Sequence, residues 1–170
     1  MHQSSMDEMA AFRDKYLDRN KKLRIYDLGS RKIGTARTYK ELFDCDNWEY
    51  IGVDMEPGEN VDLNMADWNS TSDCDVAISG QMLEHTEWPW TIVQMIQVAL
   101  KPKGLACIIA PSAGPEHKYP IDCYRFLPDG MRALADWAGL NVLQAYISNI
   151  KAKANDGSHK WKDCVLIARK

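Results

Sequence analysis

The sequence lacks the features of membrane, disulfide-rich and repeat proteins. No apolar run approaches the roughly 20 residues of a membrane-spanning helix, and the first five residues do not lead into a signal-peptide apolar region. The five cysteines are scattered, odd in number and without a Cys-x-x-Cys pair, which disfavours a disulfide framework and a zinc site. Internal repeats and low-complexity segments are also absent. We therefore expect a cytoplasmic protein with reduced thiols.

The charge balance gives no electrostatic reason to expect a nucleic-acid partner. The 170 residues carry a formal net charge of -3, with a pI near 5.8, whereas nucleic-acid-binding domains present basic surfaces. Hydrophobic residues make up 45% of the chain, and its length suits one core. We expect one domain over residues 1–170 that acts on a small molecule, away from membranes, and is compatible with a homodimer.

Apolar strands alternate with amphipathic helices along the chain, which predicts an α/β fold. Strands are expected at residues 23–28, 48–54, 75–79, 105–110, 141–147 and 163–168, and helices at 6–20, 35–43, 89–100 and 131–138. The last two strands lack a helical connection and predict an antiparallel hairpin at one sheet edge. A short polar stretch replaces the usual crossover helix before residue 75. We expect a Rossmann-like three-layer sandwich, mostly parallel, with a reduced helix count.

Acidic residues end the first two predicted strands. Asp27 and Gly29 lie at the end of the first strand, and Asp54 ends the second. Parallel strands place their carboxyl ends at one edge, where two carboxylates can take the hydroxyls of a ribose and a glycine lets the backbone approach the ligand. Either aspartate could be an ordinary turn residue, but their joint placement favours ligand contact. The pattern predicts a nucleoside-binding crevice.

Further landmarks follow the predicted strands in a fixed order. They are Asp27-Leu28-Gly29-Ser30, Asp54, Asp67-Trp68, Gln81-Met82-Leu83-Glu84-His85 and Leu100-Lys101-Pro102-Lys103-Gly104. Together they resemble the class I S-adenosylmethionine-dependent methyltransferases, particularly the methyltransferase type 11 group. The resemblance spans roughly residues 23–140.

The resemblance implies S-adenosylmethionine as cofactor and S-adenosylhomocysteine as product. Asp54 would bind the ribose and Asp67 would lie near the adenine, although Asp62 competes for that role. Trp68 would stack on or flank the base. The implied cofactor-binding residues are Asp27, Gly29, Ser30, Asp54, Met55, Asp67, Trp68, Ser79, Gly80 and Gln81.

Two departures from the family pattern concern glycines. Residues 30–32, Ser-Arg-Lys, stand where the family has further glycines, so the loop keeps only Gly29 and a distant Gly34. This bears on how closely the methionine portion of the cofactor can pack against the backbone. Lys103 replaces a usual glycine, and we expect Gly104 to supply the turn instead.

The loop at residues 111–128 is dense in reactive side chains and resembles a His-x-Tyr-Pro-x-Asp-x-x-Arg-Phe stretch of some of these enzymes. Methyl transfer depends on holding the acceptor in line with the methyl group. A general base adds on the order of 10²–10⁴-fold. The candidate catalytic residues are His117, Asp122 and His85, and the candidate acceptor-binding residues are Tyr119, Arg125 and Glu84.

The same residues admit structural interpretations. Glu84 and His85 could fix the start of the following helix, His117 could have only local partners, and Asp122 could pair with Arg125 and pin the loop. A magnesium site at His85, His117 and Asp122 is disfavoured, because magnesium prefers carboxylates and water to imidazoles. We expect no metal.

We predict methyl transfer to a hydroxyl of a sugar, a glycan precursor or a natural product. The N-terminal helix, within residues 1–20, could serve as a lid over the cofactor. An NAD-dependent oxidoreductase would need a fuller Gly-x-Gly-x-x-Gly turn. A catalytically silent binding module, and an RNA or protein methyltransferase that uses the basic residues 151–162, stay open as alternatives.

Overall fold

A computed structural model describes residues 1–69, 72–149 and 157–170. Its elements, with η for 3-10 helices, are α1 (Gln3–Tyr16), β1 (Leu23–Leu28), η1 (Tyr39–Leu42), β2 (Trp48–Asp54), β3 (Leu63–Asn64), η2 (Met65–Asp67), β4 (Cys74–Gly80), η3 (Leu83–His85), α2 (Pro89–Ala99), β5 (Leu100–Pro111), α3 (Pro128–Ala138), β6 (Asn141–Ile147), η4 (Ser158–Lys160) and β7 (Asp163–Arg169). The first half of the basic stretch at residues 151–162, residues 151–156, lies outside the described residues.

The strands form one seven-stranded sheet in the order β3-β2-β1-β4-β5-β7-β6. The strands from β1 to β5 pair in parallel, while β7 runs antiparallel to both β5 and β6. This confirms the mostly parallel sheet and its antiparallel C-terminal hairpin. The parallel strands end at one edge, which is where ligands bind in open α/β sheets.

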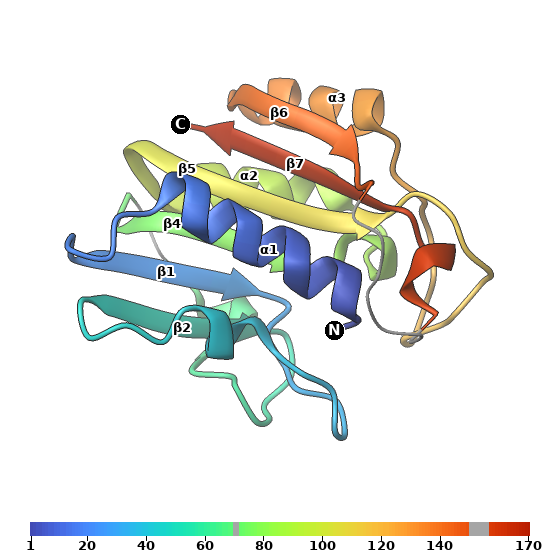
Figure 1. Cartoon of the computed structure of the whole chain (residues 1–170), viewed down its shortest axis with the longest axis horizontal. Helices are drawn as coiled ribbons and strands as arrows, with labels where there is room; N and C mark the ends of the chain where they lie inside the picture. Colours follow the sequence, from blue (N-terminus) through green and yellow to red (C-terminus); the bar gives the residue numbers. More distant parts are fainter. Residues whose placement is uncertain (70–71, 150–156) are drawn as a thin grey trace.

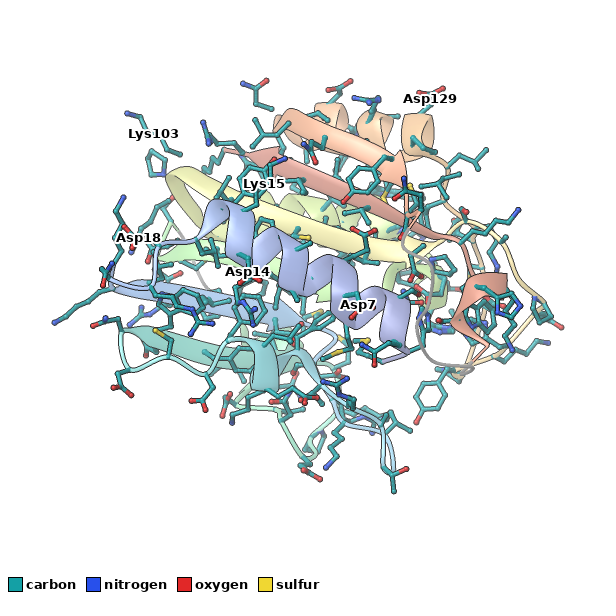
Figure 2. The ribbon with its side chains drawn as sticks, in the orientation of Figure 1. Asp7, Asp14, Lys15, Asp18, Lys103 and Asp129 are labelled. Atoms are coloured by element: carbon teal, nitrogen blue, oxygen red, sulfur yellow. The ribbon has the colours of Figure 1, made fainter. Side chains whose placement is uncertain are left out.

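Helices cover both faces of the sheet, as the three-layer prediction required (Figure 1). Met6, Met9 and Phe12 of α1 are buried against one face, and α2 and α3 pack on the other. Figure 2 shows Asp7 and Asp14 on the side of α1 that is turned away from the sheet. Within the described residues, no helix combines the length and apolar character that crossing a bilayer requires.

A helix forms at each predicted place except between β1 and β2, although α1 runs from Gln3 to Tyr16 rather than over residues 6–20. The prediction of a helix at residues 35–43 is wrong, because only the 3-10 turn η1 forms there. Tyr39 and Phe43 are both buried in this short turn. The Tyr39 hydroxyl lies 2.6 Å from the Ser5 hydroxyl of α1. Anchoring by two aromatic side chains thus takes the place of an amphipathic helix.

The connection between α2 and β5 also differs from expectation. β5 begins at Leu100, directly after α2, rather than at residue 105. Lys103 itself adopts the left-handed conformation, with φ 70°, and Gly104 does not. The expectation that Gly104 supplies the turn is therefore wrong. Gly104 is needed for space, because an added Cβ would lie 2.9 Å from the carbonyl oxygen of Lys101.

Replacing Lys103 with glycine should stabilise the protein. A left-handed lysine is strained relative to glycine, so K103G should raise the free energy of unfolding by roughly 0.5–1 kcal/mol. Urea unfolding followed by circular dichroism measures this change. The companion variant G104A should lower stability through its contact with Lys101. Destabilisation by K103G would contradict the strain argument.

Candidate active site

A cavity of about 830 Å³ opens at the carboxyl ends of the parallel strands. Its walls come from the loops after β1, β2, β4 and β5, together with the start of the chain. Many of the predicted site residues meet there. Those that line the cavity are Asp27, Gly29, Ser30, Asp54, Met55, Gly80, Gln81, His85, His117 and Tyr119.

Asp27 is the buried carboxylate of this cavity. Its side chain lies at the end of β1, where the residue is 1% exposed. The Tyr50 hydroxyl donates to Asp27 Oδ2, while Oδ1 has no hydrogen-bond partner among the described residues. Burial raises the pKa of Asp27 to about 7, against the hydrogen bond from Tyr50, and the Asp54 charge raises it further. The fold thus retains a carboxyl oxygen that needs a donor.

Asp54 lies at the end of the neighbouring strand β2 in a more open setting. Its Oδ2 accepts the backbone N–H of Arg31 at 3.0 Å. Its Oδ1 accepts the N–H of Glu56 at 3.2 Å. These bonds tie the loop after β1 to the end of β2, so Asp54 both shapes the cavity wall and presents an acceptor to it.

The loop after β1 is built around Gly29. Its φ of 79° favours glycine, and an added Cβ would lie 2.8 Å from the side chain of Met82. The Ser30 hydroxyl donates to the carbonyl oxygen of Asn60 at 2.7 Å, and the Asn60 amide donates back to the Ser30 carbonyl at 2.8 Å. This reciprocal pair holds the loop in the absence of the family's further glycines.

The end of β4 forms the cavity floor. A Cβ on Gly80 would come within 2.0 Å of the Tyr39 hydroxyl, so the residue leaves room for η1. Gln81 follows with a φ of 55° and donates from Nε2 to Asp163 at 3.0 Å. The hydroxyl of Ser79 donates to the Leu28 carbonyl at 2.9 Å. Ser79 therefore joins β4 to β1 and does not line the cavity.

The residues predicted to lie near the adenine fall outside the cavity lining. Asp67 is exposed, and Trp68 packs edge-on against Tyr26 with ring centroids 5.3 Å apart. Asp62 accepts the backbone N–H of Gly52 at 2.7 Å and has a structural partner. The cavity is lined instead by the buried Met65, which sequence reasoning missed. An adenine contact by Asp67 or Trp68 stays a prediction.

Two histidines meet at the other end of the cavity. The rings of His85 and His117 lie 4.8 Å apart, and His85 Nδ1 donates to the carbonyl oxygen of Ile121 at 2.7 Å. Trp161 flanks His117 at 4.4 Å between ring centroids. Burial and the neighbouring His85 lower the pKa of His117. His117 is therefore neutral at neutral pH, as a general base must be.

The Asp122–Arg125 pair lies behind His117 rather than in the cavity lining. Arg125 donates to both Asp122 oxygens, at 2.6 and 2.8 Å, and also donates to the Pro115 carbonyl at 2.8 Å. The hydrogen bond from Arg125 holds the pKa of Asp122 well below its usual range. Asp122 also accepts the His117 backbone N–H at 2.7 Å. This geometry supports the interpretation that the pair pins the loop.

Glu84 is enclosed next to the histidines. Glu84 is fully buried, and neither of its carboxyl oxygens has a hydrogen-bond partner among the described residues. Burial raises the pKa of Glu84 to about 8. Its Oε1 lies 3.7 Å from His85 Nε2. Glu84 does not itself line the cavity, so it can reach an acceptor only through its neighbours.

Chain segments that are distant in sequence complete the cavity. Met1, His2 and Trp161 line it, and sequence reasoning did not find them because no motif marks them. The Ser4 hydroxyl donates to Asp163 at 2.6 Å, which fixes the start of α1 to β7. Only this start reaches the cavity, so the lid role of the N-terminal helix stays a prediction.

No family model and no curated protein matches this sequence. Among solved structures, the chain is similar to the 1,6-didemethyltoxoflavin-N1-methyltransferase of Burkholderia thailandensis, solved with S-adenosylhomocysteine and 1,6-didemethyltoxoflavin. The identity is 16% and the TM-score 0.72, over 98% of this chain and 78% of the other. The [4+2]-cyclase SpnF aligns at 15% identity and TM-score 0.71, over 98% and 80%.

An S-adenosylmethionine-dependent methyltransferase from Mesorhizobium loti aligns over its full length. Its identity to this chain is 15% and its TM-score 0.64, over 97% of this chain and 100% of the other. In all three comparisons the likeness covers nearly the whole of this chain. The chain therefore has the Rossmann-like fold of the S-adenosylmethionine-dependent methyltransferases.

The raised pKa of Asp27 should make the protein less stable at high pH. Between pH 4 and about 7 the folded state keeps a proton that the unfolded chain has lost, so stability falls as pH rises through that window. D27N has no carboxyl to ionise at this position, so it removes this loss of stability. At pH 8 its free energy of unfolding should exceed that of the parent by roughly 4 kcal/mol at most. Urea unfolding at pH 4 and pH 8 measures the difference.

The exposed aspartate Asp67 provides the control for this measurement. D67N should unfold like the parent at both pH values, because its carboxyl is solvated in the folded and unfolded states. Equal stability of D27N and the parent at pH 8 would contradict a buried, proton-holding Asp27.

Proposed function

We propose that this protein transfers a methyl group from S-adenosylmethionine to a hydroxyl oxygen of a small acceptor. A sugar, a glycan precursor or a natural product is the proposed acceptor class. The observation that carries the proposal is the unpaired oxygen of buried Asp27 in a cavity that has two histidines at its other end. A cofactor binds at one end, and an acceptor can be deprotonated at the other.

The described residues fit the cofactor. A buried carboxylate oxygen without a partner, such as Oδ1 of Asp27, is unfavourable unless a donor or a cation reaches it. The ammonium group of the cofactor's amino acid portion would offer Asp27 both a hydrogen-bond donor and a positive charge. Asp54, at the end of the adjacent strand, is proposed to accept hydrogen bonds from the ribose hydroxyls, and Gly29 to allow close approach of the loop. This arrangement supports S-adenosylmethionine as the cofactor.

The acceptor end supports a general-base role for His117. The bound sulfonium supplies an activated methyl group, which moves to the acceptor oxygen and leaves S-adenosylhomocysteine. His117 accepts the proton that the hydroxyl loses. Tyr119 lines the same end of the cavity and is proposed to contact the acceptor. Asp122 and Arg125 are proposed to position His117 through its backbone.

An NAD-dependent oxidoreductase is disfavoured by the loop after β1. Pyrophosphate binding in such enzymes uses free backbone N–H groups at this turn. Here the N–H groups of Gly29 and Ser30 donate to the Val53 carbonyl, at 2.8 and 3.3 Å. The N–H of Arg31 donates to Asp54. These three backbone N–H groups already donate hydrogen bonds within the protein, so they are not free to bind a pyrophosphate.

Calorimetric titration should show micromolar binding of S-adenosylmethionine and S-adenosylhomocysteine, and no binding of NAD. Because the ligand ammonium group favours ionised Asp27, affinity should rise from pH 6 to pH 8 and binding should release a proton. Comparing buffers of different ionisation enthalpy detects that proton. D27N should weaken binding about 10–100-fold, the cost of a hydrogen bond to a charged group.

The titration also separates the enzyme from its rivals. Binding of NAD alone would replace the methyltransferase with an oxidoreductase. If none of the three ligands binds, the protein is a silent module with a methyltransferase fold. Wild-type affinity in D27N would show that Asp27 does not contact the cofactor.

Removal of the His117 imidazole should abolish most of the methyl transfer. After a screen of hydroxylated acceptors, H117A should lose on the order of 10²–10⁴-fold in kcat while S-adenosylhomocysteine affinity is kept. H159A is the matched control, because His159 is exposed and does not line the cavity. Full turnover in H117A would exclude His117 from the chemistry.

A further inference from the structure

Glu84, His85 and His117 form a cluster that sequence reasoning did not assemble. Each offers one ligand atom, and these atoms lie within 4.8 Å of one another. Glu84 Oε1 and His85 Nε2 are 3.7 Å apart, close to the roughly 3.4 Å between two ligands of a tetrahedral zinc ion with bonds of about 2.1 Å. His117, carried on the loop after β5, has only a small distance to close.

The charge of Arg125 offsets the burial of Glu84 only in part, because the pKa of Glu84 is still raised to about 8. Neither of its oxygens accepts a hydrogen bond from a described residue, and the side chain is 0% exposed. The guanidinium of Arg125 is engaged with both oxygens of Asp122. A buried carboxylate in this position needs a cation or a donor, and the imidazole Nε2 of His85 lies 3.7 Å from its Oε1.

Each imidazole has its Nδ1 beside an oxygen atom of the loop after β5. His85 donates from Nδ1 to the Ile121 carbonyl at 2.7 Å, which leaves the lone pair of Nε2 directed away from that bond. His117 Nδ1 lies 3.4 Å from Asp122 Oδ2. Metal-bound histidines commonly have a carbonyl or carboxylate beside the second ring nitrogen, because it fixes the ring and raises its basicity.

We propose that Glu84, His85 and His117 bind a divalent first-row transition-metal ion at the acceptor end of the cavity. Two imidazoles and one carboxylate suit Zn²⁺, Mn²⁺, Co²⁺ or Fe²⁺, whereas Mg²⁺ prefers oxygen ligands. The sequence-based expectation of no metal considered Asp122 as the carboxylate. In the structure Arg125 engages Asp122, and Glu84 stands beside the histidines instead.

The ion would act on the acceptor. Both histidines line the cavity, so its remaining coordination positions face the space proposed for the acceptor hydroxyl. A metal ion would lower the pKa of a bound hydroxyl, so that the acceptor could lose its proton to solvent water before its oxygen takes the methyl group. In this form His117 would be a ligand of the ion rather than the base. The chemical role rests on the proposed function, but metal binding itself does not.

The test is a cobalt titration of chelator-treated, full-length protein without cofactor. Co²⁺ should produce visible d–d absorption that Zn²⁺ abolishes at stoichiometric concentration and that Mg²⁺ leaves unchanged. E84Q and H117Q should each weaken Co²⁺ binding at least tenfold. C123S and H159A are controls for ligation by an exposed thiol or imidazole and should bind like the parent. Circular dichroism confirms that each variant is folded.

The outcomes separate this inference from the methyltransferase proposal. Absence of Co²⁺ binding, or parental affinity in both E84Q and H117Q, would overturn the metal site. S-adenosylhomocysteine titration in the presence of a chelator tests the cofactor site independently. Cobalt binding without S-adenosylhomocysteine binding would leave the metal site standing and refute the methyltransferase.

Discussion

The parallel pairing of β1 with β2 and β4 is the constraint on which the rest of the structure depends. Its register sets Asp27 opposite Gly52 and Ile78, so that the loops after all three strands open on the same side of the sheet. The antiparallel β7 then brings Asp163 to that edge, opposite Pro111 at the end of β5. A cavity forms there because the loops after β1, β2, β4 and β5 converge on this edge with part of α2 and with the residues that precede α1 (Figure 1).

Asp27 and Glu84 are buried carboxylic acids near this edge, and each is costly to the fold. Burial raises the pKa of Asp27 to about 7 and that of Glu84 to about 8. Each retains oxygen atoms without a described hydrogen-bond partner. A protein selected only for stability would replace such groups with neutral ones. Asp27 lines the cavity, and Glu84 lies beside His85, which also lines it. This arrangement is what the proposed cationic cofactor and the proposed metal-held acceptor would require.

The cavity walls depend on polar links between distant parts of the chain. Asp163 at the start of β7 accepts hydrogen bonds from Ser4 of α1 and from Gln81 after β4. Asp122 holds the loop after β5 through Arg125 and the His117 backbone. These links sit in a largely enclosed region, where a hydrogen bond is stronger and an unpaired group is more costly than in water. They position the histidine end of the cavity relative to the Asp27 end.

The sequence by itself determined the strands, the sheet type and the acidic ends of β1 and β2. Apolar runs bounded by turn residues are local signals, and Asp27, Gly29 and Asp54 follow them directly. Tertiary structure decided the rest. Burial of aromatic side chains replaced the helix expected at residues 35–43 with a single turn. The residues that surround Glu84 in space could not be predicted from its neighbours in sequence. The proximity of Glu84 to the loop at residues 111–128 depends on how β4 and β5 pair.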